Sequence, residues 1–216
     1  MIDPQLEQWL QLNGYEHFVF LSYPRVPDAS AARFARSVAK AVREGFADFT
    51  DKPDCERVFV DVECIPKGVN WDRCLQAALY RSVVMVAVCA PIYYRPEHLW
   101  CGREYQAMLS LGEIRRAPSV LPLIVKRFPN YPLPSAVSRL EYFDLANEVT
   151  RPNFARCRQF RNAVESIMTR AATVAGALRS NNAVAHPVPP DFQFPQCSAF
   201  EDYNAPNQSA PLRSLL

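Results

Sequence analysis

The chain has 216 residues, of which 49% are hydrophobic and 21% charged, and this size and composition are typical of one globular domain with a short appendage. The formal net charge of +2 gives no bulk attraction to nucleic acid or to an anionic membrane, so neither is an expected partner. There are only 6 glycines against 19 prolines, and because no two glycines lie closer than ten residues apart, the glycine-rich phosphate loops G-x-G-x-x-G and G-x-x-x-x-G-K-[ST] are excluded.

Strand-like and helix-like segments alternate along the chain. In order they are a strand at His17–Tyr23, a helix that begins at Asp28 or Ser30 and ends near Gly45, a strand at Arg57–Asp61, a helix at Val69–Tyr80, a strand at Ser82–Ala90, a helix from Glu97 or His98 to Gly112, a strand at Ser119–Lys126, a weak strand at Leu140–Leu145 and a long helix from Asn153 to about Leu178. The run Val83–Cys89 has no polar alternation, as in a parallel strand that is covered on both faces. The pattern therefore predicts an α/β domain with helices on both faces of a mostly parallel sheet.

The cysteines, the N-terminus and the longest uncharged run indicate the cellular compartment in which this domain is expected. Seven cysteines with no C-x-x-C pair favour neither a zinc ribbon nor a disulfide framework. The N-terminus lacks the basic and apolar regions of a signal peptide, and the longest uncharged run, Ser82–Tyr94, is shorter than the roughly 20 residues that span a bilayer. We therefore expect a cytoplasmic protein without a membrane partner.

The two ends of the chain differ from its middle. Six prolines stand in the last thirty residues, with little periodicity and only scattered aromatic residues. Such a composition is typical of a linker or tail. We divide the chain into an N-terminal extension (1–15), an α/β domain (16–180) and a flexible proline-rich tail (181–216).

Chemically versatile side chains follow each of the first three strands. Ser22–Arg25 follow the first strand, Asp61–Gly68 follow the second, and Tyr93 follows the third. Ligands of open parallel sheets bind at the carboxyl ends of the strands, so these residues are expected to meet in one cleft. Trp100 and Glu104 are four residues apart on the next predicted helix and so share one face of it. The cleft can stack a planar ring, pair with phosphate and hold a sugar; a core tryptophan and a solvated glutamate remain the structural alternative.

In their order and spacing these motifs resemble a Toll/interleukin receptor (TIR) domain. The residues that carry the resemblance are Phe18–Tyr23, Val58–Val62, the loop that ends in Gly68 before Trp71, Leu79–Ser82 with the strand after it, the Tyr93/Tyr94 turn and Trp100-Cys-x-x-Glu104. The resemblance covers about residues 16–126, and the rest to about Leu178 matches only as an expected last strand and helix. It implies a flavodoxin-like three-layer sandwich around a sheet of about five parallel strands.

The resemblance also implies a function and a site. TIR domains include non-enzymatic adaptors that self-associate and a branch, found in bacteria among others, that cleaves NAD⁺. In the NAD-cleaving branch Glu104 would be the catalytic residue, and the substrate-binding residues would be Tyr23, Arg25, Asp61, Gly68, Trp71, Tyr93 and Trp100. Arg25 would meet the pyrophosphate and a tryptophan would stack on a base, although Pro24 interrupts the basic stretch that the family carries after the tyrosine.

The implied reaction is that of an NAD⁺ nucleosidase or ADP-ribosyl cyclase. The products would be nicotinamide and either ADP-ribose or a cyclic ADP-ribose-type signal, with NAD⁺ as the substrate and neither a cofactor nor a metal. By family, activity would depend on self-association through the Asp61–Trp71 loop, and the role would be antiviral defence signalling, with a separate sensor or effector protein.

A single carboxylate is enough for this chemistry. Ordinary glycosidases need a second carboxyl group to protonate an alkoxide leaving group, whereas the cationic pyridinium of NAD⁺ departs as neutral nicotinamide. One ionised carboxylate can stabilise the positive charge that develops at C1′, or attack it. A position near a helix N-terminus would favour the charged form of Glu104.

Four other interpretations remain open at this point. The first is a TIR scaffold without catalysis, which assembles through the Asp61–Trp71 loop. The second is a Cys/His hydrolase that uses Cys101 and His98, three residues apart on one helix. The others are a nucleoside deoxyribosyltransferase-like activity on a similar fold and a metal site, which would be formed by Asp61, Glu63 and Asp72.

Overall fold

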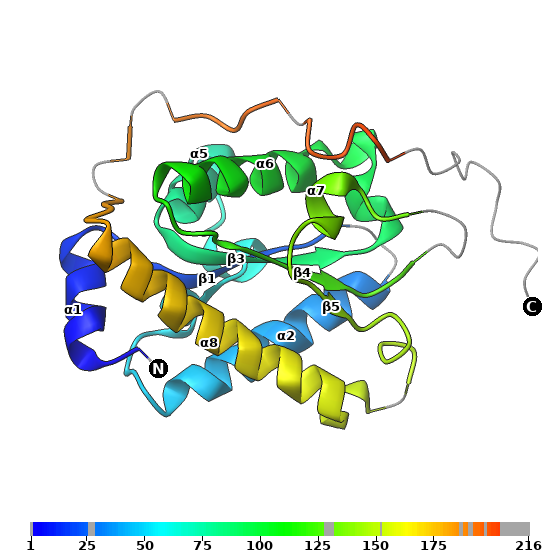
Figure 1. The fold of residues 1–216 in the computed structure, drawn as a ribbon, viewed down its shortest axis with the longest axis horizontal. Helices are drawn as coiled ribbons and strands as arrows, with labels where there is room; N and C mark the ends of the chain where they lie inside the picture. Colours follow the sequence, from blue (N-terminus) through cyan, green and yellow to red (C-terminus); the bar gives the residue numbers. More distant parts are fainter. Residues whose placement is uncertain are drawn as a thin grey trace, which may run out of the picture.

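The computed structural model describes residues 2–25, 29–127, 132–151, 153–185, 188–189, 192–196 and 198–203. Within these residues five parallel strands form one sheet in the order β2-β1-β3-β4-β5 (Figure 1). The strands are β1 (His17–Ser22), β2 (Val58–Phe59), β3 (Ser82–Cys89), β4 (Val120–Ile124) and β5 (Phe143–Asp144). This order is flavodoxin-like and confirms the predicted fold. It places the switch in strand order, where such folds bind ligands, between β1 and β3.

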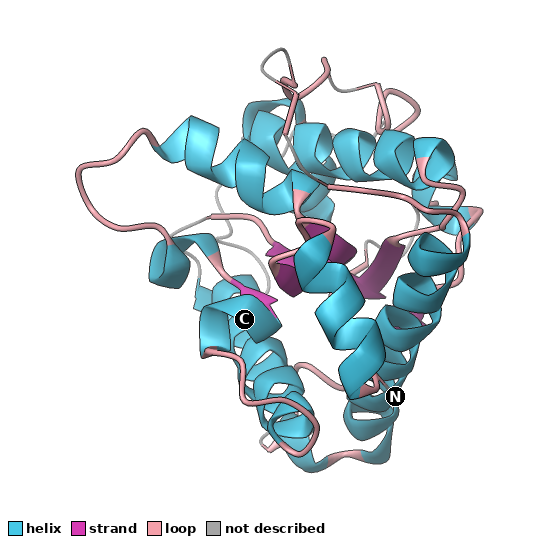
Figure 2. Ribbon diagram, turned by 90° about the vertical axis from the view of Figure 1, so that its left-hand side faces the viewer, coloured by secondary structure: helices cyan, strands magenta, loops and turns pink. Residues whose placement is uncertain are grey.

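Helices cover both faces of the sheet. On one face lie α2 (Ala29–Ala47) and α8 (Arg158–Ser180), and on the other lie α5 (Trp71–Tyr80) and α6 (Leu99–Ile114) (Figure 1). Figure 2 shows the strands between these two helical layers. Successive residues of β3 alternate between the two cores: Val86 and Val88 pack toward α2 and α8, whereas Met85 and Ala87 pack toward α5 and α6. Burial on both faces explains the unbroken apolar run of this strand.

The remaining elements are short. They are α3 (Asp54–Arg57), α4 (Asp61–Cys64), α7 (Ser135–Ser138) and the 3₁₀ turns η1 (Pro91–Tyr94), η2 (Pro96–His98) and η3 (Phe154–Arg156). Asp61 was expected at the end of the second strand and instead begins α4. None of the described helices is long and apolar enough to cross a membrane.

The helix predicted to begin at Asp28 or Ser30 corresponds to α2, and its predicted end near Gly45 is two residues too early. Helix α2 continues to Ala47, and Gly45 instead lies against α8. A Cβ atom at Gly45 would lie 2.4 Å from Sδ of Met168. The glycine therefore serves a close approach of two helices and not a helix end. The predicted start at Asp28 lies outside the described residues.

The N-terminal extension contains a helix that the sequence pattern did not predict, α1 (Pro4–Leu12). The Asp3 side chain caps this helix by accepting a hydrogen bond from the Leu6 amide at 2.8 Å, and Pro4 occupies the first turn. Leu6 and Leu10 are buried in the core beneath α2 and α8. The boundary at residue 15 stays a prediction, but the extension packs on the domain.

A disulfide joins Cys55 and Cys64, a single bridge that the sequence did not predict. Cys55 lies in α3 and Cys64 in α4, on either side of β2. Because β2 has only two residues, the flanking turns bring the two Cα atoms to 5.7 Å, within the range that a disulfide spans. An odd cysteine count argues against a framework but does not exclude one local bridge.

The described parts of the proline-rich tail lie along the outer side of α5 and α6 (Figure 1). Phe200 is buried against Tyr93, Tyr94 and Tyr105, and the Asp202 carboxylate accepts a hydrogen bond from the Ser135 amide at 2.7 Å. The boundary at residue 180 stays a prediction. Aromatic contacts join these described segments to the domain, and the flexibility of the tail stays a prediction.

Candidate active site

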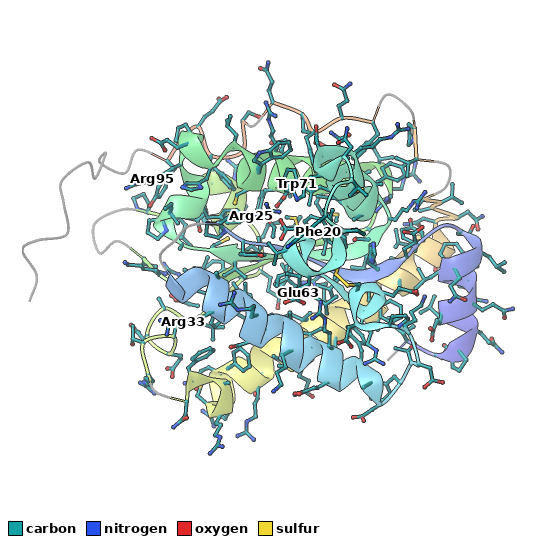
Figure 3. All side chains as sticks on the ribbon, turned by 180° about the vertical axis from the view of Figure 1, so that it is seen from behind. Phe20, Arg25, Arg33, Glu63, Trp71 and Arg95 are labelled. Atoms are coloured by element: carbon teal, nitrogen blue, oxygen red, sulfur yellow. A yellow bond between two sulfur atoms is a disulfide. The ribbon has the colours of Figure 1, made fainter. Side chains whose placement is uncertain are left out.

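A cavity of about 210 Å³ lies at the carboxyl ends of β1 and β2, beside α5 and α6. Six of its lining residues were predicted as site residues: Tyr23, Arg25, Asp61, Trp71, Trp100 and Glu104. The others are Phe20, Leu21, Leu75, Glu97, His98 and Cys101. Figure 3 shows Phe20, Arg25 and Trp71 near one another at this edge of the sheet. The tertiary structure thus brings together predicted site residues that are up to 81 positions apart in the sequence, from Tyr23 to Glu104.

Glu104 is the buried carboxyl group of this cavity, with 6% of its surface exposed. The hydroxyl of Ser22, at the end of β1, donates a hydrogen bond to Glu104 Oε2 at 2.5 Å. The Tyr93 hydroxyl lies 2.7 Å from Ser22 Oγ. Because the one hydroxyl proton of Ser22 is directed to Glu104, Tyr93 is the donor of the second bond. The chain from Tyr93 through Ser22 to Glu104 fixes the orientation of the carboxyl group.

Burial controls the protonation of this group. It raises the pKa of Glu104 from its ordinary value of 4.5 to about 7, while the Ser22 hydrogen bond and the charge of Arg25 act in the opposite direction. We expected the start of the helix to favour the charged form, and this expectation is wrong. Glu104 is the sixth residue of α6, and the loss of solvent outweighs any favourable dipole. Near neutral pH both forms of Glu104 are populated.

A second group of predicted residues forms the mouth of the cavity. Arg25 forms an ion pair with Asp61, and the Asp61 carboxylate also accepts hydrogen bonds from the Tyr23 hydroxyl at 3.1 Å and from the Val62 amide at 2.7 Å. The Arg25 guanidinium lies 4.5 Å from the centre of the Trp71 ring. The ends of β1 and β2 and the start of α5 are therefore joined by one network.

Two tryptophans form an aromatic wall. The rings of Trp71 and Trp100 meet edge to face with their centres 4.9 Å apart. Trp100 is 36% exposed, so part of its side chain is accessible to a ligand. The Trp71 Nε1 atom is buried and has no hydrogen-bond partner among the described residues. A ligand that supplies an acceptor would satisfy this donor.

Two predicted binding residues do not line the cavity. Tyr93 is fully buried behind Ser22. Gly68 lies in the exposed loop before α5, where its φ of +87° favours glycine. No role was predicted for Ser22, although a signal was present. Ser22 is two residues after Phe20 in β1, so both side chains point to the face that α6 covers.

The Cys/His and metal interpretations lose support in this geometry. Burial raises the pKa of the Cys101 thiol well above its ordinary value, so the thiol is protonated at neutral pH. Among the described residues no group of three or more His, Cys, Asp or Glu side chains could hold a metal ion. The acids suggested for a metal have other partners: Asp61 pairs with Arg25, Glu63 with Arg43, and Asp72 accepts a hydrogen bond from Gln76.

Comparison with known proteins gives one match. The family model described as TIR domain matches residues 19–160, which is more than half of the chain. No curated protein and no solved structure matches the chain. The matched range contains all residues that line the cavity.

Proposed function

Because the chain belongs to the TIR domain family, we propose that it acts as the enzymatic members of that family do and cleaves the nicotinamide–ribose bond of NAD⁺. The observation that carries the proposal is Glu104, a buried carboxyl group with a pKa of about 7 that faces an aromatic-walled cavity. Perturbed carboxyl groups in clefts mark functional sites more often than structural ones. The cavity also lies beside the switch in strand order, where this fold class binds ligands.

The reaction needs one ionised carboxylate. The bond between C1′ and the ring nitrogen breaks, and its electron pair goes to the nitrogen, which turns the cationic pyridinium into neutral nicotinamide. Glu104, once ionised, stabilises the positive charge that develops at C1′. Water then attacks C1′ and loses a proton, which gives ADP-ribose; attack by a nucleophilic atom of the adenine ring in place of water gives a cyclic product. The face of Trp100 or Trp71 offers a platform for the nicotinamide ring.

The purified chain tests the proposal directly. Incubation with NAD⁺ should release free nicotinamide, and chromatography of the second product separates ADP-ribose from a cyclic form. If activation requires assembly, turnover per molecule will rise steeply with protein concentration. A total rate strictly proportional to protein concentration, which means constant turnover per molecule, contradicts this requirement. No nicotinamide release at any protein concentration would contradict the proposed reaction.

A non-catalytic scaffold is the second candidate, and one observation favours it. Val62 and Val69 stand on the segment between β2 and α5 with 59% and 44% of their surfaces exposed. The segment that the family resemblance assigns to self-association therefore carries apolar surface that a partner could cover. Self-association without nicotinamide release would favour this candidate. A role in defence signalling, with a separate sensor or effector, is compatible with either function and remains part of the proposal.

Replacement of Ser22 by alanine should shift the pH dependence of cleavage. The Ser22 hydroxyl lowers the pKa of Glu104, so its loss raises that pKa further and leaves less ionised carboxylate at a given pH. We expect the acidic limb of the kcat/KM profile to move up by about one pH unit, equivalent to about 1.4 kcal/mol. Ser180→Ala, which removes an exposed hydroxyl at the end of α8, is the matched control. An unshifted limb would show that Ser22 does not tune Glu104.

A further inference from the structure

A second and larger cavity lies beside the first. Its volume is about 720 Å³, and Trp100 lines both cavities. It lies between α5, α6 and the described tail residues 188–189 and 192–194. Binding sites for small molecules occupy roughly 300–1,000 Å³, so the first cavity, at about 210 Å³, is too small for a whole dinucleotide. The second cavity supplies the missing volume.

The two cavities differ in charge. The first has the carboxyl groups of Asp61, Glu97 and Glu104 against one cation, Arg25. The second is lined by three arginines and one acid: Arg73, Arg81, Arg103 and Asp72. The Asp72 carboxylate accepts a hydrogen bond from the Gln76 side chain. A cationic ring is therefore suited to the first cavity and an anion to the second.

Two of the three arginines are free to bind an anion. Among the described residues no carboxylate lies within ion-pair distance of Arg73 or Arg103, whereas Arg81 pairs with Glu16. Arg103 lies over the Trp100 ring at 5.7 Å, and its buried Nε has no hydrogen-bond partner in the described part of the chain. Guanidinium groups bind phosphate through pairs of parallel hydrogen bonds. The cavity thus has unused donors of the type that phosphate requires.

The tail forms one wall of this cavity. Phe192 meets the Tyr80 ring with centres 4.8 Å apart, and Phe194 meets Trp100 at 5.8 Å. Both phenylalanines line the cavity. They hold the segment against α5 and α6 and offer apolar surface to a planar base. A segment predicted as a linker therefore contributes to a site.

We propose that the second cavity binds the nucleoside diphosphate half of the dinucleotide whose nicotinamide end lies at Glu104. This inference rests on the proposed function. The diphosphate contacts Arg73 and Arg103, the base packs on the aromatic side chains of the tail, and the substrate passes Trp100 between the two cavities. Arg25, which the family resemblance assigns to the pyrophosphate, is already neutralised by Asp61, so the charge of the phosphates is better matched on the other side of Trp100.

The test is the binding of ADP, measured by calorimetry on Glu104→Gln protein so that NAD⁺ can serve as a competitor without being cleaved. In this background Arg73→Gln and Arg103→Gln should each weaken ADP binding by about tenfold, the loss of one charge-assisted hydrogen-bonded contact. Arg158→Gln is the control, since Arg158 is an exposed arginine of α8 on the opposite face of the sheet. Equal affinity in all four proteins would overturn the proposal. Arg73 is exposed, so its variant tests the site without a folding defect.

Two further measurements test whether the nucleotide bound in the second cavity is part of the substrate NAD⁺. NAD⁺ should displace ADP competitively, and simultaneous binding of both would overturn the assignment to the substrate. In the protein with Glu104 intact, Arg103→Gln should raise KM for NAD⁺ with little change in kcat, whereas the control Arg158→Gln should change neither. If ADP binding depends on the arginines but no nicotinamide is ever released, the proposed reaction fails while the cavity remains a nucleotide site.

Discussion

Replacement of Glu104 by glutamine should lower NAD⁺ cleavage by about 100- to 1,000-fold, the range found when a group that stabilises transition-state charge is removed. Glutamine keeps the shape of the side chain and can still accept a hydrogen bond from Ser22, so the cavity should remain intact. It cannot carry the negative charge that the developing cation at C1′ requires. Release of nicotinamide under single-turnover conditions measures the effect.

The same variant should be more stable than the natural protein at neutral and alkaline pH. Burial raises the pKa of Glu104 from 4.5 to about 7, so the folded state binds this proton more tightly than the unfolded state. The stability of the natural protein therefore falls as the pH rises from about 4.5 to about 7 and stays lower above that range, by about 3 kcal/mol. Glutamine removes this cost, and the two proteins should converge near pH 4.

Urea unfolding at pH 4, 6 and 8 measures this difference, with Glu113→Gln as the control because Glu113 is an exposed glutamate of the same helix. Loss of cleavage together with a gain in stability above pH 7 identifies a residue that the fold keeps for function at the expense of stability. A Glu104→Gln protein that is less stable at pH 8, or that cleaves NAD⁺ at the natural rate, contradicts this assignment.

Arg115→Leu should lower the free energy of unfolding by about 3 kcal/mol. Arg115 is only 4% exposed, and its guanidinium donates hydrogen bonds to the carbonyl oxygens of Tyr80 and Ser82, the second at 3.2 Å. It also lies over the rings of Tyr15 and Tyr80, 5.2 Å from each centre. Leucine would remove both hydrogen bonds and both ring contacts of this buried guanidinium, and the loss of a buried, hydrogen-bonded charged group costs several kcal/mol.

Denaturant unfolding measures this loss, and Arg161→Met, at an exposed position within α8, is the control. Arg115→Lys should give an intermediate loss, because lysine keeps the charge but lacks the planar fork that reaches two carbonyls. If Arg115→Leu is as stable as the control, the junction of α1, α5 and α6 does not depend on this arginine.

Local patterns were sufficient for the architecture of this protein. A strand such as β3 shows its burial on two faces through an unbroken apolar run, and amphipathic helices show theirs through three-and-four spacing. Once strands and helices alternate, the carboxyl edge of a parallel sheet follows. For that reason the sequence alone could assign residues from distant parts of the chain to one cleft, namely Tyr23, Arg25 and Glu104.

The properties of the site depend on distances and solvent exclusion that no short stretch of sequence contains. The pKa of Glu104 is set by the elements that bury it, and these outweigh the position in α6 that the sequence did show. The hydrogen bond from Ser22 crosses from β1 to α6, and the tail becomes a wall of the second cavity because its phenylalanines meet Tyr80 and Trp100. Gly45 lies inside α2, which ends at Ala47, and it faces the Met168 side chain of α8. Residue patterns reveal which face of an element is buried, whereas tertiary packing determines what lies opposite and how much water remains between them.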